Sequence, residues 1–133
     1  SDELKQKLDG LEVIHDETYN SAGQMRKGFK EVTDPREAPG ARHRIFRTHP
    51  HTGRKALFLG RRRNAYVVGL SLEESEALLD QLWAHATQAR FTWAQVWQTG
   101  DLVMWDNTCT LHRRDAFDAS TRRLMHRTQI AAH

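Results

Sequence analysis

The sequence predicts a β-rich fold with flanking helices. Three observations lead to this prediction: short apolar runs recur along the chain, turn-forming glycines and prolines separate several of them, and two stretches show leucines at helical spacing. With 133 residues, of which 38% are hydrophobic, the chain suits one domain with a modest core.

The first predicted element is a capped amphipathic helix at the start of the chain. Ser1 can cap this helix, and Leu4, Leu8 and Leu11 follow at the spacing that places side chains on one helical face. The next stretch, 15–30, has mixed character, and its two glycines weaken any prediction of a helix there.

Short strands are expected in the middle of the chain. Apolar residues cluster within 43–48, 56–59 and 66–70, each at the length of a typical strand. A loop with two prolines precedes the first of these runs, and Pro50 and Gly53 mark a turn between the first and the second.

The clearest local signal predicts a helix after these strands. Ser71 and Glu74 have the S-x-x-E spacing of a capping box, in which each side chain accepts a hydrogen bond from the other residue's backbone. An apolar face at helical spacing follows, so we expect a helix that packs on the core. This face consists of Leu78, Leu79, Leu82, Trp83 and Ala86.

Residues 91–105 predict a β-hairpin. Phe91, Trp93 and Trp97 alternate onto one face of an extended chain, and residues 99–100 supply a turn before a second apolar run.

Composition limits the classes of function. Basic residues outnumber acidic ones by 20 to 17, a mild excess that does not by itself imply nucleic acid. Seven arginines and one lysine, with no acidic residue, lie within 39–72, which is either a solvated basic face or an anion-binding surface. Cys109 is the single cysteine, so no intrachain disulfide forms within this sequence. We therefore expect a soluble cytoplasmic protein without a membrane span and, because no initiator methionine is present, a piece of a longer chain.

Two apolar/polar alternations near the end of the chain carry the candidate site residues. In 108–112, His112 shares a face with two threonine hydroxyls. In 122–130, Arg123 and Arg127 share a face about 13 Å apart, so that they could hold two separate anionic groups. From the pattern alone, a surface histidine and an edge strand with solubilising arginines explain the same residues.

Other candidates lack supporting context. His15 and Glu17 form H-x-E, a spacing that can place two metal ligands, but we interpret them as surface residues. His49 and His51 lie in a turn and are expected to be exposed, and the three arginines of 61–63 have no glycine-rich loop to form a phosphate cradle.

The segments "WDNTCTLHRRDAFD" and "TRRLMHRTQI" resemble the C-terminal signature of the taurine/2,4-dichlorophenoxyacetate dioxygenase family. Its members are non-haem Fe(II), 2-oxoglutarate-dependent oxygenases. The likeness extends to "FRTHPHTGRKALFLG" and to "SLEESEALLDQLWAHATQARFTWAQVWQTGDLVMWDN". The opening "LKQKLDGLEVIHD" resembles the helix that follows the family's first metal motif, so the resemblance spans nearly the whole chain.

The resemblance implies a fold and three residue roles. The fold is a double-stranded β-helix, or jelly roll, whose C-terminal part residues 1–133 would form. By position, His112 matches the second histidine of the family's two-histidine, one-carboxylate iron site. Arg123 matches the arginine that binds the distal carboxylate of 2-oxoglutarate. Arg127 matches one that helps to bind the acidic group of the substrate in some members, or that supports the site.

The resemblance also implies that part of the iron site is missing from this sequence. The family takes its first histidine and its carboxylate from a motif upstream of the part that residues 1–133 resemble. His15 and Glu17 correspond instead to the family's later helix. We therefore expect residues 1–133 to be the C-terminal portion of one dioxygenase domain, inactive alone, with the N-terminal half as its partner.

The activity implied for the whole protein is hydroxylation of a small organic acid, with 2-oxoglutarate and O2 consumed and succinate and CO2 released. The segment "FLGRRRNAYVVGLSLEES" favours an aryloxyalkanoate-like substrate over a taurine-like one. One alternative is a non-catalytic module that binds nucleic acid through residues 39–72. The basic residues of this segment are not interleaved with aromatic side chains that could stack on bases, which argues against this alternative. Another is a different iron-dependent reaction, such as halogenation or desaturation. No membrane partner is expected, and a homo-oligomer stays open.

Overall fold

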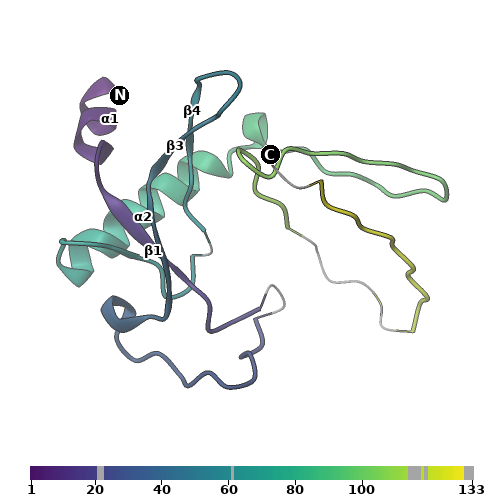
Figure 1. The fold of residues 1–133 in the computed structure, drawn as a ribbon, viewed down its shortest axis with the longest axis horizontal. Coiled ribbons are helices and arrows are strands. Elements are labelled where there is room, and N and C mark those ends of the chain that lie inside the picture. Colours follow the sequence, from purple (N-terminus) through teal and green to yellow (C-terminus); the bar gives the residue numbers. More distant parts are fainter. Residues whose placement is uncertain (21–22, 61, 114–117, 119, 131–133) are drawn as a thin grey trace.

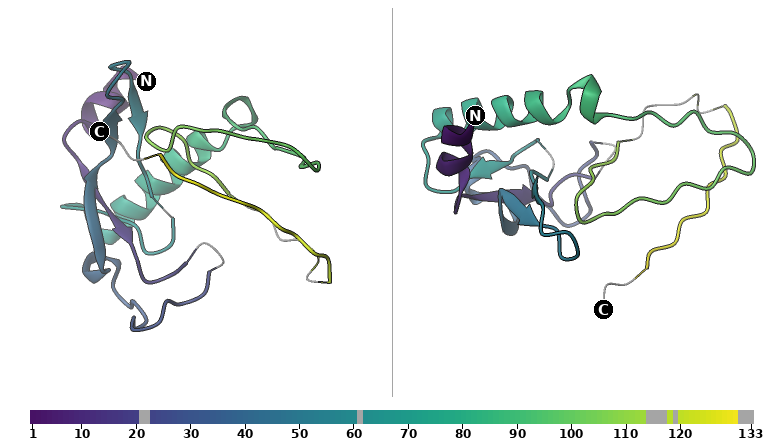
Figure 2. Two further views of the ribbon diagram at one scale, coloured as in Figure 1. Left: turned by 45° about the vertical axis from the view of Figure 1, so that its right-hand side comes forward. Right: turned by 90° about the horizontal axis from the view of Figure 1, so that it is seen from above.

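The computed structural model describes the chain except residues 21–22, 61, 114–117, 119 and 131–133. Residues 1–91 form a body of two small antiparallel sheets, with a long helix packed along them (Figure 1). The described part of 92–130 runs out from this body as extended chain (Figure 2). The predicted β-rich architecture with flanking helices is therefore confirmed for the body.

The first helix, α1, spans Asp2–Leu8 as predicted. The Ser1 hydroxyl caps it by accepting a hydrogen bond from the Leu4 backbone N–H at 3.3 Å, and Leu8 is buried. The helix ends before Gly10, whose φ of +87° is a backbone conformation that favours glycine.

The strand β1, Glu12–Asp16, is the central strand of the three-stranded sheet β2-β1-β5. The family resemblance predicted a helix that continued through these residues, and that prediction is wrong. The left-handed backbone at Gly10 stops the helix, and β-branched Val13 and Ile14 favour an extended chain buried on both faces.

The strands beside β1 are antiparallel to it. β2 spans Gly40–Arg44 and β5 spans Tyr66–Val67, and Val13 pairs with residues of both neighbours. The predicted strand 66–70 is thus present in shortened form.

A hairpin of β3, Phe46–Thr48, and β4, Lys55–Leu57, forms the second sheet. Buried Ile45 separates β2 from β3, so the predicted strand 43–48 is divided between the two sheets. Residues 49–54 form the turn of this hairpin, where the backbone N–H of His49 donates to the Arg54 carbonyl at 2.8 Å.

The helix α2, Leu72–Ala86, begins with the predicted capping box. The Ser71 hydroxyl accepts from the Glu74 backbone N–H at 3.2 Å, and the Glu74 carboxylate accepts from the Ser71 N–H at 3.0 Å. The leucines of its apolar face are buried against both sheets, as predicted. The core of the body contains Leu8, Val13, Ile45, Leu59, Ala65, Val67, Leu78, Leu79 and Leu82.

The strands predicted after α2 are not formed. The hairpin expected in 91–105 is replaced by a short 3-10 helix, η2 (Ala89–Phe91), and extended chain, and the described residues of 108–112 and 122–130 contain no strand either. Large apolar side chains of this part are exposed, with Trp93 at 73% and Leu102 at 92%. An alternating pattern specifies a strand only where another sheet or helix covers its apolar face, and no described element covers these residues.

We predict that Leu79→Ala lowers the free energy of unfolding by about 2–5 kcal/mol, because Leu79 is fully buried and its loss leaves a cavity. Leu72→Ala, at the exposed start of the same helix, is the matched control and should cost less than about 1 kcal/mol. Urea unfolding followed by far-UV circular dichroism measures both. Equal losses in the two variants would show that α2 does not pack as described.

Candidate functional site

Two of the three predicted site residues converge on Trp105. The ring of His112 lies 5.4 Å from the Trp105 ring, at an angle of 51°. The guanidinium carbon of Arg127 lies 5.6 Å from the centre of the Trp105 ring, within the range of a cation–π interaction. The imidazole and one guanidinium group thus share one aromatic neighbour, although neither residue lies in a strand.

The third predicted residue, Arg123, lies four positions before Arg127 on the same extended segment. Its side chain, like those of Arg127 and His112, is exposed to solvent. Exposure leaves these groups accessible to small anions and, for His112, to a metal ion.

The residues after Trp105 form a tight turn that leads to His112. One carboxylate oxygen of Asp106, Oδ1, accepts from the Thr108 N–H at 2.7 Å and from the Thr108 hydroxyl at 2.5 Å. The Asp106 carbonyl accepts from the backbone N–H of Thr110 at 3.2 Å and also from its hydroxyl. Asp and Thr favour such local side-chain hydrogen bonds, so the sequence D-N-T-C-T explains the turn.

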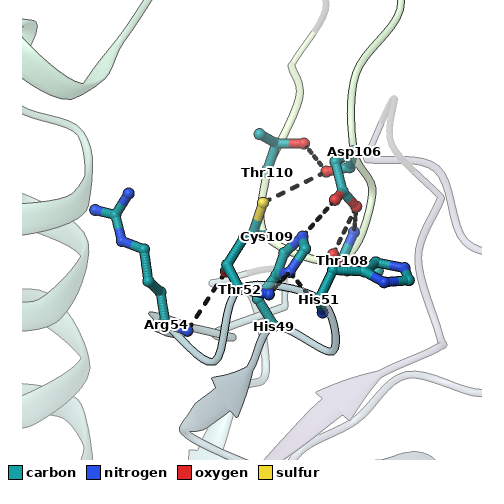
Figure 3. A network of polar contacts seen from close by, with 8 residues as sticks. All are labelled: His49, His51, Thr52, Arg54, Asp106, Thr108, Cys109 and Thr110. Atoms are coloured by element: carbon teal, nitrogen blue, oxygen red, sulfur yellow. Dashed lines mark hydrogen bonds and ion pairs between the residues drawn. The ribbon is translucent and has the colours of Figure 1, made fainter.

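A histidine of the body holds this turn. His49 Nε2 lies 2.7 Å from the second carboxylate oxygen of Asp106, Oδ2, across 57 positions of sequence (Figure 3). The expectation that His49 is an exposed turn residue is wrong, because only 14% of its side chain is exposed. No local signal in the sequence connects residues so far apart, and only the fold brings them together.

Hydrogen bonds keep the Asp106 carboxyl group ionised. The Thr108 hydroxyl has the largest effect, followed by the Thr108 backbone N–H and His49, and together they hold the pKa of Asp106 far below its usual range. Asp106 therefore stays a hydrogen-bond acceptor throughout the physiological pH range.

Cys109 lies near this pair, and the ligand atoms of His49, Asp106 and Cys109 are all within 4.8 Å of one another. Zinc bonds of about 2.0–2.2 Å in tetrahedral geometry would separate the histidine nitrogen from the carboxylate oxygen by roughly 3.3–3.5 Å. The observed 2.7 Å is instead a hydrogen-bond length. We interpret the pair as a structural hydrogen bond.

The H-x-E pair does not form a metal site. His15 Nε2 donates to the Phe58 carbonyl at 3.0 Å, and its ring lies 4.7 Å from that of His43. A Cβ atom at position 60 would come within 2.6 Å of the His15 ring, so Gly60 is required for this packing. Burial lowers the pKa of His15, with only partial opposition from the hydrogen bond to Phe58, and Glu17 is exposed.

Several cations of the basic segment 39–72 have partners within the chain. Arg62 forms ion pairs with two carboxylates of α2, at 2.6 Å and 2.8 Å. The Arg63 guanidinium lies 3.5 Å from the centre of the Tyr19 ring, and Lys55 contacts Asp9 at 3.3 Å. This arrangement does not support the alternative of a nucleic-acid surface. Among the described residues, no helix has the length and apolar character needed to cross a membrane.

We predict that the free energy of unfolding falls as the pH drops from 7.5 to 5.5, in part through His15. Because its pKa is lower in the folded protein, the unfolded chain binds more protons, and this contribution is lost as the pH falls through the folded pKa. Urea unfolding of His15→Gln at several pH values should show a flatter dependence. His85→Gln, at an exposed position of α2, is the control and should keep the wild-type slope. A wild-type slope in His15→Gln would contradict the assignment.

Comparison with known proteins gives a consistent set of relatives. The chain is 37% identical, over 127 residues, to the alpha-ketoglutarate-dependent 2,4-dichlorophenoxyacetate dioxygenase of Cupriavidus pinatubonensis, covering 94% of this chain and 43% of that protein. It is 33% identical over 134 residues to pentalenolactone F synthase of Streptomyces arenae, covering 94% of this chain and 45% of the relative.

The structure is also similar to the crystal structure of AAD-2 in complex with Mn(II) and N-oxalylglycine, with a TM-score of 0.73 and 35% identity. That match covers 92% of this chain and 48% of AAD-2, so the chain spans less than half the length of each of these relatives. The profile of the family described as "Taurine catabolism dioxygenase TauD, TfdA family" matches residues 1–129. The chain therefore belongs to the TauD/TfdA family of dioxygenases.

Proposed function

We propose that residues 1–133 are the C-terminal portion of the catalytic domain of a non-haem Fe(II)/2-oxoglutarate-dependent dioxygenase. The observation that carries the proposal is the arrangement around Trp105, where His112 and Arg127 meet in a segment that matches the family signature. Relatives named as alpha-ketoglutarate-dependent dioxygenases support it.

The chain supplies one of the ligands that the proposed iron site needs. His112 is an exposed imidazole on a hydrogen-bonded loop, and imidazole is a preferred ligand of non-haem iron. The other histidine and the carboxylate of the triad would come from the N-terminal half of the domain. When bound, the iron would supply the oxygen chemistry that converts 2-oxoglutarate to succinate and CO2.

The arginines would hold the acids that take part in the reaction. Arg123 is the proposed partner of the distal carboxylate of 2-oxoglutarate, because a guanidinium presents two parallel N–H donors to a carboxylate. Arg127, held over Trp105, is the proposed partner of the substrate's acidic group. The two arginines would thus set the orientation of both organic acids relative to His112.

The proposed substrate is a small organic acid of the aryloxyalkanoate type. The sequence segment 58–75 favours this class, and a relative named for 2,4-dichlorophenoxyacetate supports it. Hydroxylation of the carbon beside the ether oxygen gives an unstable product. In this product, the bond between that carbon and the ether oxygen then cleaves.

The N-terminal half of the domain is the proposed partner of the segment 92–130, whose described residues are mostly exposed. The alternating apolar residues of this segment, with Trp93 and Leu102 exposed, have the pattern of jelly-roll strands that lack a covering sheet. Strands supplied by the N-terminal half would pair with them and bury this face. Residues 1–133 contain a single cysteine and need no disulfide, which supports a reducing compartment, and we propose the cytoplasm as the location of the complete protein.

We predict that Arg123→Ala in the complete protein raises the concentration of 2-oxoglutarate needed for half-maximal succinate release by at least about tenfold. A charge-assisted hydrogen bond is worth roughly 1.5–3 kcal/mol, and about 1.4 kcal/mol is a factor of ten. Arg123→Lys should recover only part of the loss, because an ammonium group lacks the planar fork. Arg122→Ala is the matched control, and an unchanged 2-oxoglutarate dependence in Arg123→Ala would contradict this role.

We also predict that residues 1–133 alone release no succinate from 2-oxoglutarate, because His112 is one ligand of a three-ligand site. The assay contains Fe(II), ascorbate and 2-oxoglutarate, and it compares the 133-residue chain with the same chain joined to its N-terminal half. The joined protein should be active, and His112→Ala should abolish that activity while the exposed-histidine control His126→Ala retains it. Substantial release by the short chain alone would mean that other residues bind the iron.

A further inference from the structure

We propose that His49 is a positioning residue for His112, acting through its hydrogen bond to Asp106. This inference rests on the proposed function, in which His112 is a metal ligand. His49 lies in the β3–β4 turn. It neither touches the metal nor belongs to the signature segment, residues 105–130.

The hydrogen bonds of His49 determine which of its nitrogens carries the proton. Nδ1 lies 3.2 Å from the backbone nitrogens of both His51 and Thr52, and these N–H groups are donors, so Nδ1 must accept. The proton of the neutral ring therefore sits on Nε2, which donates to Asp106 Oδ2 at 2.7 Å. The turn thus presents one oriented donor toward the signature segment (Figure 3).

The donor comes from a turn that backbone hydrogen bonds join to the packed body. Residues 49–54 close the hairpin, and the Gly53 N–H donates to the His49 carbonyl at 2.9 Å. The hairpin is tied to the core by the backbone bond from Phe58 to the carbonyl of fully buried Ile45, at 2.7 Å. The position of His49 is therefore determined by the packed body.

The acceptor lies in a segment whose described residues contain no strand. Asp106 Oδ1 is occupied by Thr108, while Oδ2 faces His49, so the carboxylate joins the signature turn to the body. Within this turn, the Asp106 carbonyl holds Thr110, two residues before His112. Trp105, adjacent to Asp106, contacts the His112 ring. A displacement of Asp106 would therefore shift His112 in two ways, through Thr110 and through Trp105.

Two substitutions of His49 separate its two hydrogen-bonding functions. In His49→Asn, the amide oxygen replaces Nδ1 as the acceptor for the turn, but no group reaches Asp106. In His49→Gln, the amide nitrogen lies as many bonds from the backbone as Nε2 does and can donate to Asp106. Positioning through Asp106 therefore predicts a defect in the Asn variant and recovery in the Gln variant.

The experiment measures binding of Mn(II), as the probe metal, to the metal-free complete protein by calorimetry in the presence of 2-oxoglutarate. His49→Asn should raise the Kd for Mn(II) at least about fivefold, toward the tenfold to hundredfold range seen when outer partners of metal ligands are lost. His49→Gln should stay within about twofold of wild type. His51→Asn, which changes the exposed neighbouring histidine of the same turn, is the matched control.

A double-mutant cycle tests whether the effect passes through Asp106. Asp106→Asn replaces the acceptor, and the double variant with His49→Asn should bind Mn(II) no more weakly than the worse single variant. Additive losses would overturn the proposal, because they would show that the two residues act independently. A Kd within twofold of wild type for His49→Asn would also overturn it.

The same experiment distinguishes a failure of the proposed function from a failure of the positioning role. If His112 is not a metal ligand, His112→Ala binds Mn(II) like the wild-type protein, whatever the His49 variants do. If His112→Ala loses binding while His49→Asn keeps it, the proposed function stands and the positioning role of His49 is wrong. Thermal unfolding of the metal-free variants completes the test, since the proposal predicts weaker metal binding in His49→Asn even where its unfolding temperature equals that of His51→Asn.

Discussion

Burial of the leucine face of α2 against the two sheets is the interaction on which the rest of the structure depends. Leu78, Leu79 and Leu82 share one buried core cluster with Val13 and Ile45, which come from different parts of the chain. Each fully buried aliphatic side chain contributes about 1.5–3 kcal/mol relative to its exposed state. Because β1 is central to one sheet and the chain passes from β2 to β3 at Ile45, this one core orients both sheets.

That core also determines the position of the β3–β4 turn. The turn carries His49 at the edge of the body, and the hydrogen bond from His49 to Asp106 gives the signature segment a fixed reference point. Local hydrogen bonds also shape the signature: Thr108 and Thr110 hydrogen bond to Asp106, and Trp105 donates to Asn107 at 2.8 Å. Local bonds shape the loop, and the long-range bond places it.

Arginines of the body and of the signature segment have different surroundings. In the body, acidic side chains pair with Arg62, and the Tyr19 ring contacts Arg63. In the signature segment, Arg123 and Arg127 are exposed, and Arg127 rests on an aromatic ring. A cation on a ring is restrained while its N–H donors stay accessible, which is compatible with the acid-binding role proposed for Arg127.

The sequence by itself determined the features that depend on neighbours along the chain. The helix caps at Ser1 and Ser71 were predictable because the hydrogen bonds of a cap join residues three positions apart. The family was recognisable from its motifs, and the proposed roles of His112, Arg123 and Arg127 follow from their positions in the signature that this resemblance identifies. These features need no knowledge of the fold.

The tertiary structure decided the features that depend on distant partners. β1 became a strand because β2 and β5 flank it, although its resemblance to a helical segment predicted otherwise. The alternating runs after residue 91 did not become strands, because alternation specifies an apolar face but not the surface that covers it. The pairing of His49 with Asp106 joins positions 57 residues apart, and a hydrogen bond of 2.7 Å at that separation exists only after the body has packed.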